Sequence, residues 1–125
     1  MNNYKKLKGL IAATFTPVDT NSDINYSVIR KYAQHIKDSG ISGVFVCGTT
    51  GEFTSLTTVE RKLILEEWIK RGEGDFQIIA HVGSNNQREA MELARHAEVK
   101  GADGIGCIAP SFFKPEKVKD LIDFF

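Results

Sequence analysis

Residues 43–52 read GVFVCGTTGE, a short apolar run followed at once by a turn bracketed by two glycines. The run GVFVC has no polar member, a pattern typical of a strand covered on both faces in a parallel sheet. Shortly after it, Thr57 and Glu60 have the spacing of a capping box, which predicts a helix running to Gly72. A buried strand followed by a turn and a helix is one βα unit, the building block of α/β folds.

The same unit recurs on both sides of this stretch. Upstream, Asn25 is expected to cap a helix and Gly40 to end it; downstream, Asn86 and Gly101 have the same two roles. Further buried strands are expected at residues 9–16, 76–82 and 104–108, and a last helix after them with Pro115 at its first position. The chain therefore alternates strand and helix four times.

Two helix-to-strand turns share one pattern, GISGV at residues 40–44 and GADGI at residues 101–105. The expected strands begin about 31 residues apart, and eight such steps give about 250 residues, the usual size of a (β/α)₈ barrel. The sequence therefore predicts an α/β fold made of the first four βα units of a TIM barrel. Residues 1–125 are expected to form the amino-terminal half of that single domain.

Composition narrows the class of protein. The chain has 125 residues, 42% of them hydrophobic, and 16 basic side chains balance 16 acidic ones. This excludes wholesale disorder and gives no basic face for nucleic acid. No apolar segment approaches the roughly 18 residues of a membrane span, and no leader is recognisable at Met1, so we expect a cytoplasmic protein with free thiols at Cys47 and Cys107.

The turn at residues 48–51 is the strongest candidate site, because reactive groups of parallel barrels lie where strands end. Gly48 and Gly51 allow the backbone to turn tightly, while the hydroxyls of Thr49 and Thr50 and the neighbouring N–H groups can face an anion such as a small carboxylate. The alternative is an ordinary turn whose threonines bond to their own backbone. We expect Glu52 to be structural, accepting nearby backbone N–H bonds.

Two other patterns are rejected. GIGCIA at residues 104–109 fits a dinucleotide fingerprint nominally, but it lies within a strand and opens no helix. Cys47, His81 and Cys107 end three successive strands, yet inward-facing strand residues usually fill the barrel, so no metal is expected.

Taken in order, four motifs resemble a known family: GLIAA at residues 9–13 with Thr16-Pro17, GTTGE at 48–52, HVG at 81–83, and GADG at 101–104 before Ala109-Pro110. The chain resembles the pyruvate-dependent class I aldolases, which include N-acetylneuraminate lyase and dihydrodipicolinate synthase. The resemblance implies that Thr49 and Thr50, within the Gly48–Gly51 turn, bind the carboxylate of pyruvate.

Two features bear on the branch of the family. HVG at residues 81–83 is similar to the lyase branch, and Phe112-Phe113 stands where synthases usually carry a tyrosine pair that relays protons. The resemblance therefore implies cleavage of N-acetylneuraminate to pyruvate and N-acetylmannosamine. The alternative within the family is a synthase-like condensation of pyruvate with an aldehyde.

The family's chemistry implies groups beyond this chain. A lysine of strand six forms the Schiff base with the keto carbon, and a tyrosine after strand five moves protons; both are expected beyond Phe125, so no catalytic residue is expected here. The resemblance implies no cofactor and a homo-oligomer, a tetramer in the complete family. A second hypothesis is a non-catalytic half-barrel that assembles with another chain through its open strand edges.

Overall fold

The computed structural model describes residues 6–125 and contains one sheet of four parallel strands. The strands follow the chain in order: β1 (Ile11–Ala13), β2 (Gly43–Val46), β3 (Gln77–His81) and β4 (Gly104–Gly106). The helices are α1 (Tyr26–Asp38), α2 (Thr58–Ile69), α3 (Gln87–Lys100) and α4 (Val118–Phe124), with a short 3₁₀ helix η1 (Phe53–Ser55) before α2. This is the predicted βαβαβαβα order, and the four parallel units confirm the fold class.

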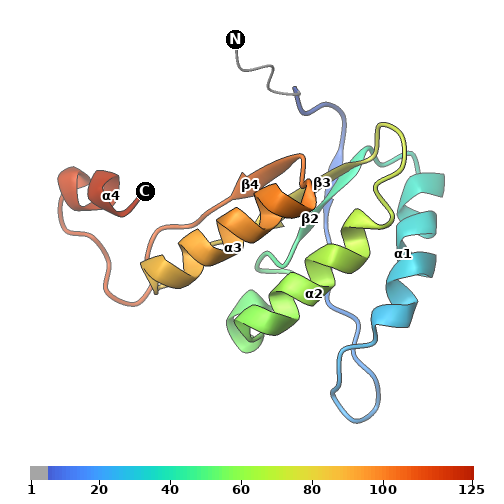
Figure 1. Cartoon of the computed structure of the whole chain (residues 1–125), viewed down its shortest axis with the longest axis horizontal. Helices are drawn as coiled ribbons and strands as arrows, with labels where there is room; N and C mark the ends of the chain where they lie inside the picture. Colours follow the sequence, from blue (N-terminus) through green and yellow to red (C-terminus); the bar gives the residue numbers. More distant parts are fainter. Residues whose placement is uncertain (1–5) are drawn as a thin grey trace.

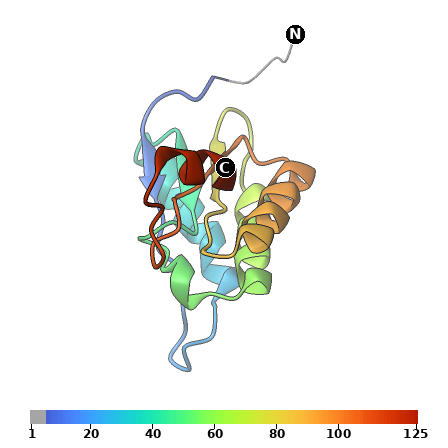
Figure 2. The same cartoon turned by 90° about the vertical axis from the view of Figure 1, so that its left-hand side faces the viewer.

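Helices α1, α2 and α3 lie side by side against one face of the sheet, while α4 stands apart beyond the carboxyl ends of the strands (Figure 1). In Figure 1, β4 runs to the left, toward the loop that leads to α4, whereas β1 runs downward; Figure 2 looks onto the side of the molecule that carries α4. Parallel strands joined by helices place every strand end at the same edge. The loops after β2 and β3 therefore share one side of the molecule.

The core fills the space between the sheet and these three helices. Val44 and Val46 of β2 are almost completely buried there, and Trp68 of α2 is fully buried. The opposite face carries the intervening residues, and Phe45 is paired in register with Ala13 and Ile79. That face is the inner wall of a barrel, and it is only partly covered because four strands form half of an eight-stranded circle.

The strand at the amino-terminal edge departs from the prediction. We expected residues 9–16 to be a buried strand, but β1 covers only Ile11–Ala13, and Ala13 is exposed. An edge strand has one neighbour instead of two, so an apolar sequence does not by itself ensure burial.

The repeated helix-to-strand turn is confirmed in atomic detail. Gly40 and Gly101 both adopt left-handed backbone angles, with φ of 75° and 85°. Each turn then repeats the same two hydrogen bonds, from Ile41 N to Ile36 O (3.3 Å) and Ser42 N to Leu10 O (2.9 Å), and from Ala102 N to Ala97 O (2.9 Å) and Asp103 N to Ile78 O (2.8 Å). A left-handed glycine closes each helix and the second bond ties the turn to the previous strand.

The helix starts agree with the sequence in two places of four. Thr57 and Glu60 form the predicted capping box, and the Asn86 side chain accepts bonds from the first turn of α3. Asn25 precedes α1 but makes no side-chain capping bond; its Oδ1 accepts from the Ser27 hydroxyl instead (2.6 Å). Pro115 was expected at the first position of the last helix, but α4 begins at Val118, so that prediction was wrong.

No helix in the described part of the chain is long and apolar enough to cross a bilayer.

Candidate functional site: the turn after the second strand

The turn at residues 48–51 follows β2 directly and is closed by its own backbone. The N–H of Gly51 donates to the carbonyl of Gly48 (3.1 Å), and the N–H of Glu52 donates to the carbonyl of Thr49 (3.0 Å). Thr49 and Thr50 are exposed. Their N–H groups have no acceptor within residues 6–125, so both remain available to a ligand. Two free N–H groups and two hydroxyls give a neutral donor set of the kind that binds a carboxylate.

The glycines of this turn serve close packing. A Cβ at Gly48 would lie 2.7 Å from the Phe45 ring, and one at Gly51 would lie 3.1 Å from the carbonyl oxygen of Thr14. We expected the glycines to let the backbone turn tightly, but the left-handed angles fall on their neighbours Cys47 and Glu52, each with φ of 55°. Such angles on residues with a side chain cost on the order of 1 kcal/mol or more and are found at sites that tertiary contacts hold in place.

The end of β1 supplies part of that support. The Thr16 hydroxyl donates to the carbonyl of Gly51 (2.8 Å), and the N–H of Thr14 donates to the carbonyl of Phe45 (3.2 Å). Thr14 is almost completely buried. The turn is thus fixed to a neighbouring strand on the side away from solvent.

Glu52 has a different role from the one predicted. Its side chain is exposed, and no residue of the described range 6–125 donates a hydrogen bond to its carboxylate. The expectation that it accepts backbone N–H bonds was therefore wrong. Glu52 instead contributes through its backbone, whose left-handed conformation directs the chain into η1.

His81 lies at the end of β3 and faces the inside of the half-barrel. Only 4% of its surface is exposed, and its ring makes edge contacts with Phe45 (centroids 5.7 Å apart) and Phe53 (4.4 Å). Burial and the nearby Arg61 guanidinium lower the pKa of His81 below its usual value, while a hydrogen bond to the Cys47 backbone opposes the shift. The imidazole is consequently neutral at pH 7.

Arg61 is the residue of this region that the sequence analysis missed. It is 4% exposed, and its guanidinium donates to the carbonyl of His81 (2.8 Å) and to that of Gly83 (3.1 Å). The same group lies 5.4 Å from the centre of the Phe53 ring. One signal could have found it: position 61 shares a helix face with the apolar Leu65 and Trp68, at spacings of four and seven.

The loop after β3 is joined to the loop after β4. Asn85 Oδ1 accepts from the N–H of Ser111 (2.8 Å) and of Phe112 (3.3 Å). Gly83 allows the two loops to approach, because a Cβ there would lie 2.8 Å from His81 Nε2 and 2.9 Å from Ile108 N. The glycine of the HVG motif at residues 81–83 is therefore required by the close packing of these two loops.

The three strand-end residues considered for zinc do not meet. Cys47 is buried in the core on the helix side of the sheet, whereas His81 faces the opposite side and Cys107 is exposed. Within residues 6–125, no three His, Cys, Asp or Glu side chains are arranged to hold a metal ion. Cys47 is a packed core residue, as expected, although it packs on the helix side of the sheet; the expectation of packing was wrong for Cys107, which is exposed.

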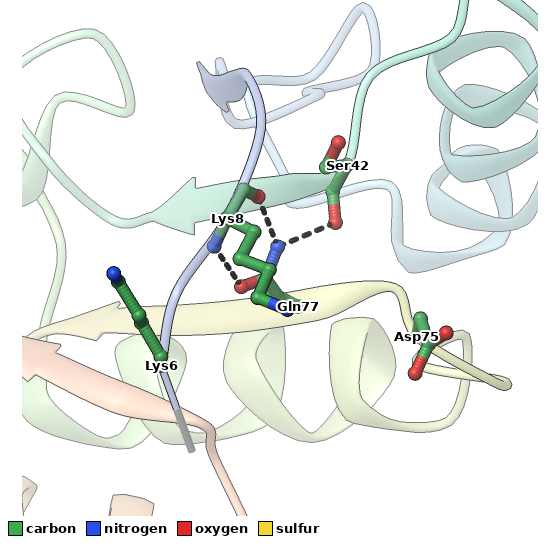
Figure 3. A pocket seen from close by; sticks show the side chains of 5 residues that line it. All are labelled: Lys6, Lys8, Ser42, Asp75 and Gln77. Carbon is green, nitrogen blue, oxygen red and sulfur yellow. Dashed lines mark hydrogen bonds between the residues drawn. The ribbon is translucent and has the colours of Figure 1, made fainter. Parts of the chain in front are cut away.

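A hollow of about 420 Å³ lies at the opposite, amino-terminal end of the strands (Figure 3). Gln77 of β3 spans it, accepting from the N–H of Lys8 (2.8 Å) and donating to the carbonyls of Lys8 (2.6 Å) and Ser42 (3.2 Å). Thr49 and Thr50 do not line it.

A parallel βα half-barrel with unpartnered N–H donors at its strand ends has the architecture of the barrel enzymes, whose active sites lie at this end of the strands. The family model described as "Dihydrodipicolinate synthetase family" matches residues 6–125. The chain belongs to this family.

Several proteins similar to this chain are named N-acetylneuraminate lyase. N-acetylneuraminate lyase of Rattus norvegicus is 48% identical over 122 residues, covering 96% of this chain and 38% of that protein, and the Homo sapiens enzyme gives the same values. Among solved structures, Proteus mirabilis N-acetylneuraminate lyase superposes with a TM-score of 0.90 at 40% identity, covering 96% of this chain and 41% of that one.

Dihydrodipicolinate synthase of Aquifex aeolicus superposes with a TM-score of 0.88 at 33% identity, covering 94% of this chain and 40% of that one. The chain spans about two-fifths of the length of these relatives. The enzymes of the family are Schiff-base aldolases that work without a cofactor, in agreement with what the resemblance implied.

Proposed function

We propose that this chain is the amino-terminal half of the single TIM-barrel catalytic domain of an N-acetylneuraminate lyase, and that it supplies the pyruvate-binding turn. The supporting observation is the pair of unpartnered N–H groups at Thr49 and Thr50, held at the strand ends beside two exposed hydroxyls. A relative 30% identical to this chain was solved in complex with pyruvate. The 48% identity to proteins named N-acetylneuraminate lyase favours that substrate.

The turn binds a carboxylate through neutral donors. The hydroxyls of Thr49 and Thr50 and their N–H groups donate to the two oxygens, while Gly48 and Gly51 keep the turn against Phe45 and the end of β1. Neutral N–H and hydroxyl donors at the end of a strand bind the carboxylate of a keto acid, and they do not react with its keto carbon. The keto group is then left free to react elsewhere in the barrel.

The reactive amine comes from another part of the barrel. Within residues 6–125, no lysine follows directly on the carboxyl end of a strand; each lies in a helix, at a helix end or in a loop or terminal segment. We therefore assign no catalytic residue to this chain and place the Schiff-base lysine and the proton-transferring tyrosine in the remaining strands. The working enzyme is proposed to be a cytoplasmic homotetramer.

A chimeric enzyme tests this proposal. This chain replaces the aligned two-fifths of the Proteus mirabilis lyase, and pyruvate release from N-acetylneuraminate is measured. Replacing both site threonines, Thr49→Val with Thr50→Val, removes two hydrogen bonds to the carboxylate, and at about 1.5 kcal/mol or more for each we expect kcat/KM to fall at least a hundredfold. Thr54→Val, at an exposed residue of η1, is the matched control and should leave the rate unchanged.

Two results would overturn the proposal. One is an active chimera that is indifferent to the loss of both threonines. The other is a covalent adduct after the isolated chain is incubated with pyruvate and borohydride and weighed, since that would place the reactive lysine here. A chimera that condenses pyruvate with an aldehyde and does not cleave N-acetylneuraminate would support the synthase alternative.

A further inference from the structure

We propose that Arg61 and His81 are positioning residues that hold the Gly48–Gly51 turn in its anion-binding shape, with Arg61 fixing the ring of His81 and His81 holding the strand end before the turn. This inference rests on the proposed function of the turn. It starts from Arg61, a buried cation with no part in the proposed carboxylate contact.

Burying the positive charge of Arg61 at this position costs free energy, so other interactions of Arg61 must offset it. It lies in the first turn of α2, where the helix dipole disfavours positive charge, and it is almost completely buried. Desolvation accordingly lowers its pKa. No acidic side chain of the described residues forms an ion pair with Arg61. The backbone carbonyls of His81 and Gly83 accept hydrogen bonds from its guanidinium instead.

The guanidinium decides which nitrogen of His81 carries the proton. Arg61 Nη2 lies 3.4 Å from His81 Nδ1, and a guanidinium can only donate, so Nδ1 must accept. The ring proton is then on Nε2. The same Arg61 atom also holds the backbone carbonyl of His81 at 2.8 Å, so both ends of the residue are fixed by one side chain.

His81 in turn reaches the residue that precedes the turn. Its ring makes an edge contact with Phe45 of β2 (centroids 5.7 Å apart), and the Phe45 ring lies directly against Gly48. The Cys47 backbone also favours the protonated form of the His81 ring. Cys47 has the left-handed φ of 55° that directs the chain into Gly48. A fixed ring at His81 therefore supports the strand end on which the direction of Thr49 and Thr50 depends.

A second contact reaches the far side of the same turn. The Arg61 guanidinium lies over the ring of Phe53, and Phe53 also packs against His81. Phe53 follows Glu52, the other left-handed residue. Arg61 thus contacts, directly or through one neighbour, the residues on both sides of the turn.

The proposal is tested by NMR on the ¹⁵N-labelled chain with variants at both positions. In the wild type, the ring nitrogens of His81 should show a single form with the proton on Nε2. Arg61→Met keeps the length of the side chain and loses its donors, and we expect a mixture of the two ring forms. We also expect the amides of Gly51 and Glu52 to exchange with solvent about tenfold faster, because losing one charged hydrogen bond shifts an opening equilibrium by about that factor.

Selectivity distinguishes positioning from a general loss of stability. A purely structural role for Arg61 would speed the exchange of core amides in α1, such as those of Ile29 and Ala33, by the same factor as the turn. His81→Gln places an amide N–H donor close to the position of Nε2 and should restore slow exchange at Gly51 and Glu52, whereas His81→Leu should not. Arg95→Met, at an exposed arginine of α3, is the matched control.

Two further arms keep the test decisive. If Arg61→Met fails to fold, Arg61→Lys retains the charge and cannot bond to both carbonyls, and it should show the same selective effect. Unchanged ring form and unchanged turn exchange in the folded variant would overturn the proposal. The chimeric enzyme judges the proposed function separately: a chimera that is indifferent to the loss of both threonines would refute the role of the turn, while ring form and exchange still decide the positioning role.

Discussion

At the scale of single residues, the loops beyond β2 and β3 depend on close approaches that leave no room for a side chain. Gly83 is the tightest of these in the β3 loop, because a Cβ there would meet both the His81 ring and the backbone of Ile108. Gly104, in the neighbouring strand, has nothing closer than 3.8 Å around its missing Cβ. Neither glycine has a positive φ, so space alone distinguishes them.

We predict that Gly83→Ala lowers the free energy of unfolding by about 1–3 kcal/mol, the usual cost of forcing atoms into a packed interior. Gly104→Ala serves as the control and should change it by less than about 1 kcal/mol, since the added methyl group meets only ordinary contacts. Urea unfolding of the three chains gives the comparison. Equal destabilisation by both substitutions would contradict the packing argument.

The two thiols differ in environment. Burial raises the pKa of the Cys47 thiol to about 12, with the positive charge of Arg61 opposing the shift, and this side chain is 4% exposed. Cys107 is exposed, and its pKa is also raised. We predict that a thiol-alkylating reagent modifies Cys107 alone in the native chain and both cysteines in urea, as read by mass spectrometry. Rapid native modification of Cys47 would show that the core opens at this point.

At the scale of elements, local sequence signals set the starts of two helices, α2 and α3. The capping box of α2 is the clearest, because the Glu60 carboxylate accepts from the N–H (2.7 Å) and the hydroxyl (2.8 Å) of Thr57. These two bonds hold the pKa of Glu60 below its usual value. They also set the start of the helix that carries Arg61.

We predict that Thr57→Ala lowers the free energy of unfolding by about 1 kcal/mol at pH 7.

A carboxyl whose pKa is lower in the folded state stabilises the fold above its unfolded pKa, and that stabilisation is lost as pH falls through the folded value. Glu60 therefore contributes a loss of stability below about pH 4.5, and Glu60→Gln should make the urea midpoint fall less between pH 7 and pH 3.5. An unchanged pH dependence in Glu60→Gln would contradict this role.

At the scale of the whole molecule, the four-stranded sheet has two open edges and one partly covered face. β1 and β4 each pair with a single neighbour. Apolar side chains remain exposed near these edges, among them Leu10 at 70% and Ile105 at 54%. Unpaired strand edges beside apolar side chains favour association with another chain.

We predict that the isolated chain self-associates with increasing concentration and that Leu10→Lys, which puts a charge beside the β1 edge, shifts it toward monomer. Val59→Lys is the control, because Val59 is 65% exposed on α2, a helix that packs against the central strands β2 and β3. Sedimentation velocity over a range of concentrations measures both. A stable monomer at every concentration would show that the edges are protected without a partner.

Much of the fold was predictable because its signals are local. Apolar runs of four or five residues, capping residues three positions apart and glycines at helix ends each act within one turn of chain. These signals specified four parallel βα units and the two matching turns at Gly40 and Gly101. They also located the turn at residues 48–51, whose role as a carboxylate site remains a proposal.

What only the tertiary structure decided depends on contacts between residues far apart in the chain. The sequence could not show that Arg61 reaches carbonyls at residues 81 and 83, or that positive φ falls on Cys47 and Glu52 and not on the glycines between them. Nor could it show that β1 stays half exposed. Periodicity reports which face of an element is apolar, whereas these features depend on what lies opposite that face, twenty or more residues away.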